Sequence, residues 1–145
     1  MKTITKFELL QKIAKGVNGK TNWTKPVLLL TKDGDSYNDC VDSIKKKYNC
    51  FYFAGVEPDH IDFVRINNKL EMKVGDVVCN GHKPEVKVYI NLGITYIEKD
   101  LRYCINLLEY ENKPVIFIVC ESDKNAGLEN IPAWVNSEFE IMRVE

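Results

Sequence analysis

Residues 25–47, KPVLLLTKDGDSYNDCVDSIKKK, predict the unit around which this chain folds. Residues 27–30 are apolar without a polar break, as expected for a strand that is covered on both faces in a parallel sheet. A turn over residues 33–35 (Asp-Gly-Asp) leads to an amphipathic helix, in which apolar residues recur at helical spacing: Cys40, Val41 and Ile44. Ser36 or Asn38 is expected to cap this helix. Many α/β proteins bind a phosphate at the turn of such a unit.

Length and composition are typical of an ordinary globular protein. The chain has 145 residues, of which 45% are hydrophobic and 28% are charged, so we expect a single domain over residues 1–145. The formal net charge of −1 excludes a global field that would draw the chain to nucleic acid or to anionic lipid. No apolar run approaches the ~20 residues of a membrane span, and residues 1–12 lack the apolar stretch of a signal peptide. We therefore expect a cytoplasmic protein with no membrane partner.

The cysteines are expected to be reduced core residues. They are odd in number and scattered along the chain: Cys40, Cys50, Cys79, Cys104 and Cys120. The alternative is a zinc site with these ligands: Cys50, His60, Cys79 and His82. The first two of them form no compact pair of ligands. We therefore expect no bound metal, and no cofactor.

Apolar runs and helical patterns alternate along the chain. The runs cover residues 27–31, 50–54, 86–91, 114–120 and 138–144, and helical spacing is found over residues 5–15 and 98–110. This alternation predicts an α/β fold, a three-layer sandwich with a mostly parallel five-stranded sheet. Residues 59–80 fit two patterns, and we expect a helix that begins after Pro58, then a strand or loop up to Gly81. Ligands of such sheets bind at the carboxyl ends of the strands, here the loops 31–37, 55–59, 91–96 and 121–128.

A second stretch contains residues of a phosphate-binding loop in a different setting. Residues 14–21, AKGVNGKT, match a looser form of that pattern, with Lys20 and Thr21 as its lysine and hydroxyl residue. The loop needs a strand before it and a helix after it, so that backbone N–H groups point at the phosphates. Here a helical pattern precedes the loop, and Pro26 follows soon after it. We therefore interpret this stretch as a polar connection between a helix and a strand.

The order of the segments resembles that of the AAA+ ATPases, nearest to the clamp-loader subunits of the delta-prime type. Residues 7–30 look like the family's first helix, its glycine-rich connector and the strand before the phosphate loop. Residues 86–122, VKVYINLGITYIEKDLRYCINLLEYENKPVIFIVCES, look like the second motif strand, a helix that ends in Leu-Leu and an acidic residue, and the sensor strand. Residues 131–145, IPAWVNSEFEIMRVE, are similar to the family's segment of proline, hydrophobic residues and Ser-Arg-Cys. The resemblance implies a P-loop NTPase type of fold and a role in DNA replication, or in a mobile element or phage.

This chain departs from the AAA+ family at the residues that carry catalysis. In the phosphate loop only Gly34 matches, while residues 35–37 replace the lysine and the hydroxyl residue. Residues 91–92 (Asn-Leu) replace the acidic pair that binds magnesium and water, and Glu138 replaces the arginine finger. Phosphoryl transfer depends on positioning and charge stabilisation, so we expect no ATP hydrolysis. The residues that remain candidates for nucleotide binding are Gly34, Ser36, Lys20 and Thr21.

We therefore interpret the chain as a catalytically inactive AAA+-like module that acts by binding another protein. Residues 127–138 are more apolar than an idle surface loop, and in the clamp-loader resemblance this stretch faces a neighbouring subunit. The expected interface residues are Trp134, Ile131 and Val135. Trp134 would be the anchor, because aromatic side chains dominate binding hot spots, although a partly buried loop position explains it equally well. The partner and the oligomeric state do not follow from the sequence.

Two other functions fit parts of the sequence. The first is a nucleotide- or nucleoside-binding enzyme on a Rossmann-like fold, with carboxylates at the strand ends that bind a metal or act as acid and base: Asp33, Asp35, Glu121 and Asp123. Turn residues that accept local backbone N–H groups explain the same carboxylates. The second is a nucleic-acid adaptor, based on the lysines at 45–47, a run that more often forms a solvated helix face.

Overall fold

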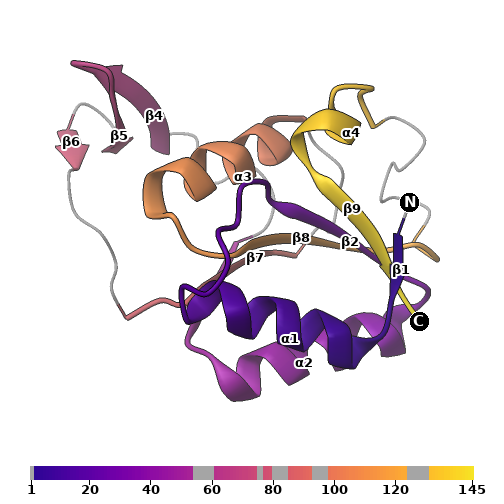
Figure 1. Cartoon of the computed structure of the whole chain (residues 1–145). Helices are drawn as coiled ribbons and strands as arrows, with labels where there is room; N and C mark the ends of the chain where they lie inside the picture. The colour runs from indigo at the N-terminus through magenta and orange to yellow at the C-terminus, as the bar shows by residue number, and fades with distance from the viewer. Residues whose placement is uncertain (1, 54–60, 75–76, 80–84, 93–97, 124–130) are drawn as a thin grey trace.

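A six-stranded sheet forms the centre of the protein. The computed structural model describes residues 2–53, 61–74, 77–79, 85–92, 98–123 and 131–145. The strands of the sheet follow the order β1-β9-β2-β8-β7-β3, and every neighbouring pair is parallel (Figure 1). Their bounds are β1 (Lys2–Ile4), β2 (Val27–Thr31), β3 (Cys50–Phe53), β7 (Val88–Asn91), β8 (Val115–Cys120) and β9 (Glu140–Val144). The residues of β2 are all buried, because it is paired on both sides and covered on both faces.

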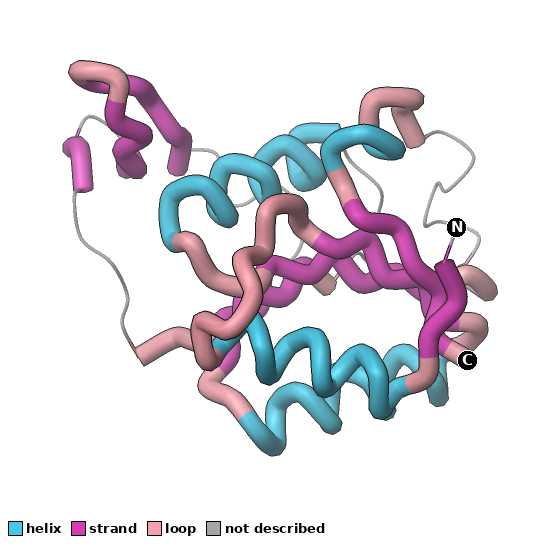
Figure 2. Tube along the Cα trace, in the orientation of Figure 1, coloured by secondary structure: helices cyan, strands magenta, loops and turns pink. Residues whose placement is uncertain are grey.

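Helices cover both faces of the sheet (Figure 2). α1 (Lys6–Val17) and α2 (Gly34–Lys47) lie on one face, and α3 (Glu98–Glu111) and the short α4 (Val135–Glu138) lie on the other. The connections after β1 and β2 cross the sheet in one direction, and those after β7 and β8 cross it in the opposite direction. Because a parallel crossover is right-handed, this reversal places the two pairs of helices on opposite faces. The predicted α/β class with a mostly parallel sheet between helices is confirmed.

The predicted strands of the sheet are all present, but the predicted number of strands is wrong. Each of the five lies within two residues of its expected bounds. The prediction omits β1, whose three residues pair with residues 142–144 of β9 at the edge of the sheet. A strand of this length has too few residues to show an alternating pattern in the sequence.

Side chains just before α1 and α2 determine where these helices begin. At α1, Thr5 Oγ1 accepts the N–H of Glu8, and Glu8 Oε1 accepts the N–H of Thr5, both at 3.1 Å, which makes a capping box. α2 begins after Asp33, whose carboxylate accepts the backbone N–H of Ser36 at 2.9 Å. The prediction that Ser36 or Asn38 caps this helix is wrong, because Asp33 offers an acceptor earlier in the chain.

The stretch that fitted two patterns forms a small antiparallel sheet in its described part. Its strands are β4 (Ile61–Ile66), β5 (Lys69–Val74) and β6 (Val77–Cys79). The helix expected after Pro58 is therefore wrong where β4 lies, whereas the strand expected up to Gly81 is confirmed by β5 and β6. Residues 54–60 lie outside the described part. Asn67 and Asn68 have φ angles of 53° and 64° and form the two-residue turn between β4 and β5. Asparagine tolerates this left-handed conformation, so the Asn-Asn pair was the hairpin signal that helical periodicity obscured.

Aromatic contacts attach this small sheet to α3. The ring of Phe63 in β4 meets Tyr103 and Tyr110 of α3 edge-on, with centroids 5.3 Å and 5.7 Å apart. Arg65 of β4 also forms an ion pair with Glu109 of α3. Such aromatic pairs contribute about 0.5–1.5 kcal/mol each beyond their buried area, so they dominate over the exposed ion pair.

The burial of β2 and β8 leads to a stability prediction. Leu29 and Ile118 are paired across these strands and are fully buried, whereas the side chain of Phe7 on α1 is 69% exposed. Replacing Leu29 or Ile118 by Ala should lower the free energy of unfolding by about 2–5 kcal/mol, because each change leaves a cavity in the core. The control Phe7→Ala should change it by less than about 0.5 kcal/mol. Urea unfolding measures all three, and an unchanged midpoint for Leu29→Ala would contradict the assignment of the core.

Candidate functional site

The carboxyl ends of β2 and β8 form the topological switch point of the sheet. These strands are neighbours, yet the connection after β2 leads to α2 on one face and the connection after β8 leads to α4 on the other. Ligands of open α/β sheets bind in the crevice at such a point. We call residues 31–37 and 121–123, together with Leu92 and Arg143, the switch-point crevice. Residues 55–59, 93–96 and 124–128 of the predicted loops lie outside the described part of the chain.

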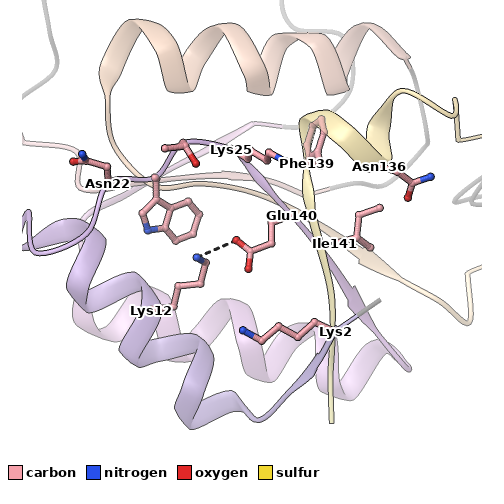
Figure 3. Close-up of a pocket in the computed structure, with 10 residues that line it drawn as sticks. Lys2, Lys12, Asn22, Lys25, Asn136, Phe139, Glu140 and Ile141 are labelled. Atoms are coloured by element: carbon pink, nitrogen blue, oxygen red, sulfur yellow. Dashed lines mark ion pairs between the residues drawn. The ribbon is translucent and has the colours of Figure 1, made fainter.

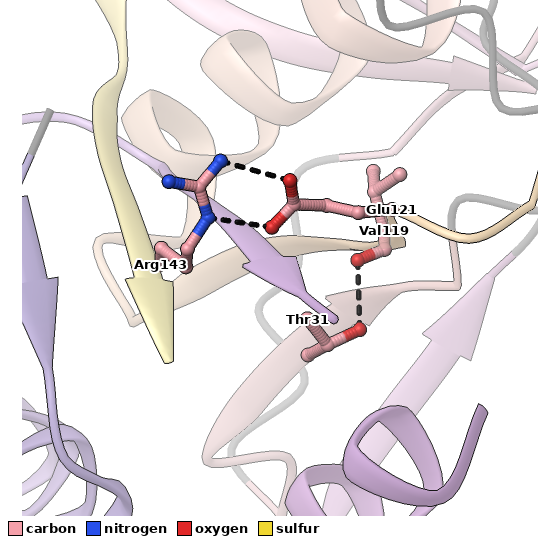
Figure 4. Close-up of polar contacts among 4 residues, drawn as sticks. All are labelled: Thr31, Val119, Glu121 and Arg143. Atoms are coloured by element: carbon pink, nitrogen blue, oxygen red, sulfur yellow. Dashed lines mark hydrogen bonds and ion pairs between the residues drawn. The ribbon is translucent and has the colours of Figure 1, made fainter. Parts of the chain in front are cut away.

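Hydrogen bonds between the two strands continue to their carboxyl ends (Figure 4). The fully buried Thr31 donates from Oγ1 to the carbonyl of Val119 at 2.9 Å. The backbone N–H of Glu121 donates to the carbonyl of Thr31 at 2.6 Å. These bonds hold β2 and β8 together at the base of the crevice, so the backbone groups involved are not available to a ligand.

The carboxylate of Glu121 is held by an arginine that the sequence patterns did not reveal. Arg143 of β9 donates from Nε to Oε1 of Glu121 at 2.6 Å and from Nη2 to Oε2 at 2.8 Å (Figure 4). This two-pronged pair joins the end of β8 to β9. The hydrogen bond from Arg143, and then its charge, lower the pKa of Glu121 from its ordinary value of 4.5. A basic residue near the carboxyl end of the last strand was the only hint of this pair in the sequence.

The N-terminus of α2 is occupied by the chain's own carboxylate. Asp33 accepts the N–H of Ser36, and this hydrogen bond lowers the pKa of Asp33, with a smaller contribution from the charge of Lys32. Gly34 and Ser36 therefore lie in the first turn of α2, which begins earlier than the predicted turn over residues 33–35 implies. A phosphate bound there would compete with the Asp33 carboxylate for the N–H groups and would meet a second negative charge at Asp35.

Tyr37 ties α2 to the end of β7. Its hydroxyl donates a hydrogen bond to the carbonyl of Leu92. Burial, and then the nearby Cys120, raise the pKa of Tyr37 to about 12. The hydroxyl therefore stays protonated at neutral pH and acts as a donor within the fold.

The carboxylates that were considered for an enzyme have separate roles. Asp33 caps α2, Glu121 pairs with Arg143, and Asp35 is exposed. The backbone N–H of Asp123 donates to the carbonyl of Cys120 at 3.1 Å, which closes a turn after β8. Among the residues that the structure describes, no three Asp, Glu, His or Cys side chains are grouped so that they could hold a metal ion.

The other two candidates for nucleotide binding lie at the opposite ends of the strands. Lys20 and Thr21 follow α1 and precede β2, so they are near the amino ends of the strands, whereas Gly34 and Ser36 follow the carboxyl end of β2. The backbone N–H groups of Lys20 and Thr21 both donate to the carbonyl of Lys15, at 2.9 Å and 3.3 Å. They satisfy a carbonyl group at the C-terminus of α1, so these two N–H groups are not available to a phosphate. The two pairs of residues cannot form one site.

The expected interface residues lie on the face of the sheet that carries α3 and α4. Trp134 is half-buried, and the guanidinium of Arg102 on α3 lies over its ring, 4.6 Å from the centroid. Ile131 is also half-buried, but Val135 is fully buried. Val135 therefore belongs to the core and has no surface to offer a partner. The cation–π contact was not visible in the sequence, because Arg102 and Trp134 are far apart in it.

Comparison of the chain with known protein families, with curated proteins and with solved structures found no match. The resemblance to AAA+ ATPases therefore remains a prediction from the residues quoted above.

No helix in the described part of the chain is both long and apolar enough to cross a membrane. Four cysteines are free thiols: Cys40 and Cys104 are buried, while Cys50 and Cys120 are half-buried. The zinc alternative includes His60 and His82, which lie outside the described residues.

The Glu121–Arg143 pair predicts a pH dependence of stability. Because the pKa of Glu121 is lower in the folded chain than in the unfolded one, its contribution is present above pH 4.5 and is lost as the pH falls below that value. After allowance for solvent screening of this partly exposed pair, the contribution is at most about 1 kcal/mol. Glu121→Gln should therefore destabilise the protein more at pH 7 than at pH 3. Urea unfolding at both pH values tests this, and an equal effect at both would show that the charge of Glu121 contributes nothing.

Proposed function

We propose that this chain is a catalytically inactive AAA+-like module that acts by binding a protein partner. The single observation that carries the proposal is that Asp33 and Arg143, the groups of the switch-point crevice placed to act on a phosphate, are engaged within the chain. Asp33 takes the place that a phosphate would occupy at α2, and Arg143 is neutralised by Glu121. A nucleoside triphosphate would have to compete with Asp33 for the N–H group of Ser36, and it would meet an arginine that Glu121 already binds.

The order of the strands supports the AAA+-like part of the proposal. The three strands that the resemblance assigns to the phosphate loop, the sensor and the second motif are β2, β8 and β7, and these are consecutive neighbours in the sheet. Their carboxyl ends therefore meet at one edge, where such motifs would have to act together. At these strand ends Asn91 lies where the resemblance places the family's acidic pair, and its neutral amide does not supply the charge that phosphoryl transfer needs.

The surface around Trp134 supports the partner-binding part. Arg102 has a side chain that is 60% exposed, and its guanidinium stacks on a half-buried tryptophan. Arginine and tryptophan are the side chains most enriched at the centres of interfaces. A partner that covered this pair would desolvate the cation–π contact and so strengthen it. We call Trp134, Arg102 and the half-buried Ile131 the Trp134 surface.

The inactive crevice leads to a prediction about catalysis. Purified protein incubated with Mg-ATP should release phosphate no faster than buffer alone, because the groups that stabilise the transition state are absent or neutralised. A coupled phosphate-release assay measures this. Turnover that is proportional to protein concentration, and that Lys20→Ala abolishes, would contradict the proposal. It would indicate that residues 14–21 bind the nucleotide.

The Trp134 surface leads to a prediction about binding. Trp134→Ala should weaken partner binding by about 2 kcal/mol or more, because it removes the aromatic anchor. Immobilised wild-type and variant proteins, each exposed to a lysate of the source cells, show by quantitative mass spectrometry which partner depends on Trp134.

Two further variants make that result decisive. Arg102→Ala should weaken the same partner, and it leaves the core intact because the Arg102 side chain is mostly exposed. Phe7→Ala, which removes an exposed aromatic ring elsewhere, should change nothing. A partner that binds wild type, Trp134→Ala and Arg102→Ala equally would rule out this surface as the interface.

A further inference from the structure

A groove lies at the amino ends of the strands, whereas the switch-point crevice lies at their carboxyl ends. It begins with a cavity of about 580 Å³ between α1 and the amino ends of β1 and β9, and its wall includes the connection before β2 (Figure 3). A second hollow of about 300 Å³ adjoins it and shares Lys2, Lys12 and Asn22 with it. We call the two together the lysine groove. Its volume lies in the range of sites that bind small molecules.

Four lysines from three segments line this groove. They are Lys2 of β1, Lys12 and Lys15 of α1, and Lys25 of the connection before β2. Two carboxylates line it as well, and both are engaged. Glu140 pairs with Lys12 at 3.1 Å, and Glu8 accepts the N–H of Thr5 in the capping box of α1.

The balance of charge in the groove is therefore positive. Lys2 and Lys25 form no ion pair with any carboxylate in the described part of the chain, so none of these carboxylates neutralises their ammonium groups. Figure 3 shows the side chains of Lys2, Lys12 and Glu140 extending into the same space. The amides of Asn22 and Asn136 add neutral hydrogen-bond donors to the lining.

Packing holds the wall of the groove in place. Trp23 is buried against α1, where a Cβ added to Gly16 would lie 2.2 Å from its Nε1 atom. Only glycine permits this close approach. The ammonium of Lys12 lies 4.9 Å from the centroid of the Trp23 ring, which positions it between the ring and Glu140. The cation is thus oriented before any ligand arrives.

We propose that the lysine groove binds a small phosphorylated molecule. Lysine ammonium groups bind phosphate as point charges, and Lys2 and Lys25 would attract a ligand anion from the two sides of the groove while the anion competes with Glu140 for Lys12. This site is independent of the proposed partner-binding function, since it involves none of the residues of the Trp134 surface. Thr21, which the sequence pattern had singled out, also lines the second hollow.

The same lining argues against a single-stranded nucleic acid as the ligand. Proteins that bind single strands stack the bases on exposed aromatic rings. The two aromatic residues of this groove, Trp23 and Phe139, are buried in the wall and present no free ring face. The groove therefore offers recognition of an anion without a platform for bases.

Inorganic pyrophosphate is a suitable probe, with binding measured by isothermal titration calorimetry at fixed ionic strength. The double variant Lys2→Ala/Lys25→Ala should weaken binding about tenfold or more, because it removes the two unpaired cations. The matched control is Lys45→Ala/Lys46→Ala, which removes the same charge from the exposed end of α2 and should leave the affinity unchanged. Absence of binding to wild type, or equal weakening in both double variants, would overturn the proposal.

Glu140→Gln provides a test in the opposite direction. It removes the carboxylate that competes for Lys12 but keeps the shape of the side chain, so it should tighten pyrophosphate binding. An unchanged affinity would place the ligand outside the groove and overturn the proposal.

In a Trp134→Phe background Trp23 is the remaining tryptophan, and its fluorescence should change on binding. A thymidine 20-mer that binds more tightly than pyrophosphate, and is lost in Lys2→Ala/Lys25→Ala, would instead identify a nucleic-acid surface and refute the small-molecule ligand.

Discussion

The parallel pairing of β2 with both β8 and β9 is the constraint on which the rest of the structure depends. Residues 27–30 of β2 are hydrogen-bonded to both neighbours, and the residues of the strand are all buried. A parallel pair requires a crossover, and right-handed crossovers dictate which face each helix covers. The placement of α1 and α2 against α3 and α4 therefore follows from the position of one strand. The switch point beside β2 follows from it too.

This arrangement gives the carboxyl ends and the amino ends of the strands different electrostatic characters. At the carboxyl ends of the strands, Asp33 and Glu121 accept hydrogen bonds from the N-terminus of α2 and from Arg143, so these two positive groups are satisfied within the fold. At the amino ends, lysines from separate segments gather around Glu140, which pairs with Lys12 alone. A net charge of −1 conceals this separation, because it sums over both ends.

Much of the sheet was predictable from the sequence, while the small sheet β4–β6 and part of the site were not. The long apolar run of β8 and the strand-turn-helix unit at β2 carried strong signals, since strands buried on both faces are continuously apolar. The Asn67–Asn68 turn was misjudged because apolar residues nearby also fitted a helical period. The loss of a phosphate site was predictable from Asp33 and Asp35. The pairing of Glu121 was not, because the sequence did not show that Arg143 lies beside it.

The sequence by itself determined the elements of the sheet, the absence of a phosphate-loop lysine after β2 and the polar nature of residues 14–21. These are local properties, set by spacing and by residue type over a few positions. Only the tertiary structure decided that Val135 is core, that Arg102 stacks on Trp134, and that lysines from β1, α1 and the connection before β2 share one groove. Each of these depends on residues that are distant in the chain and adjacent in space. Contacts of that kind follow from topology and leave no periodic trace in the sequence.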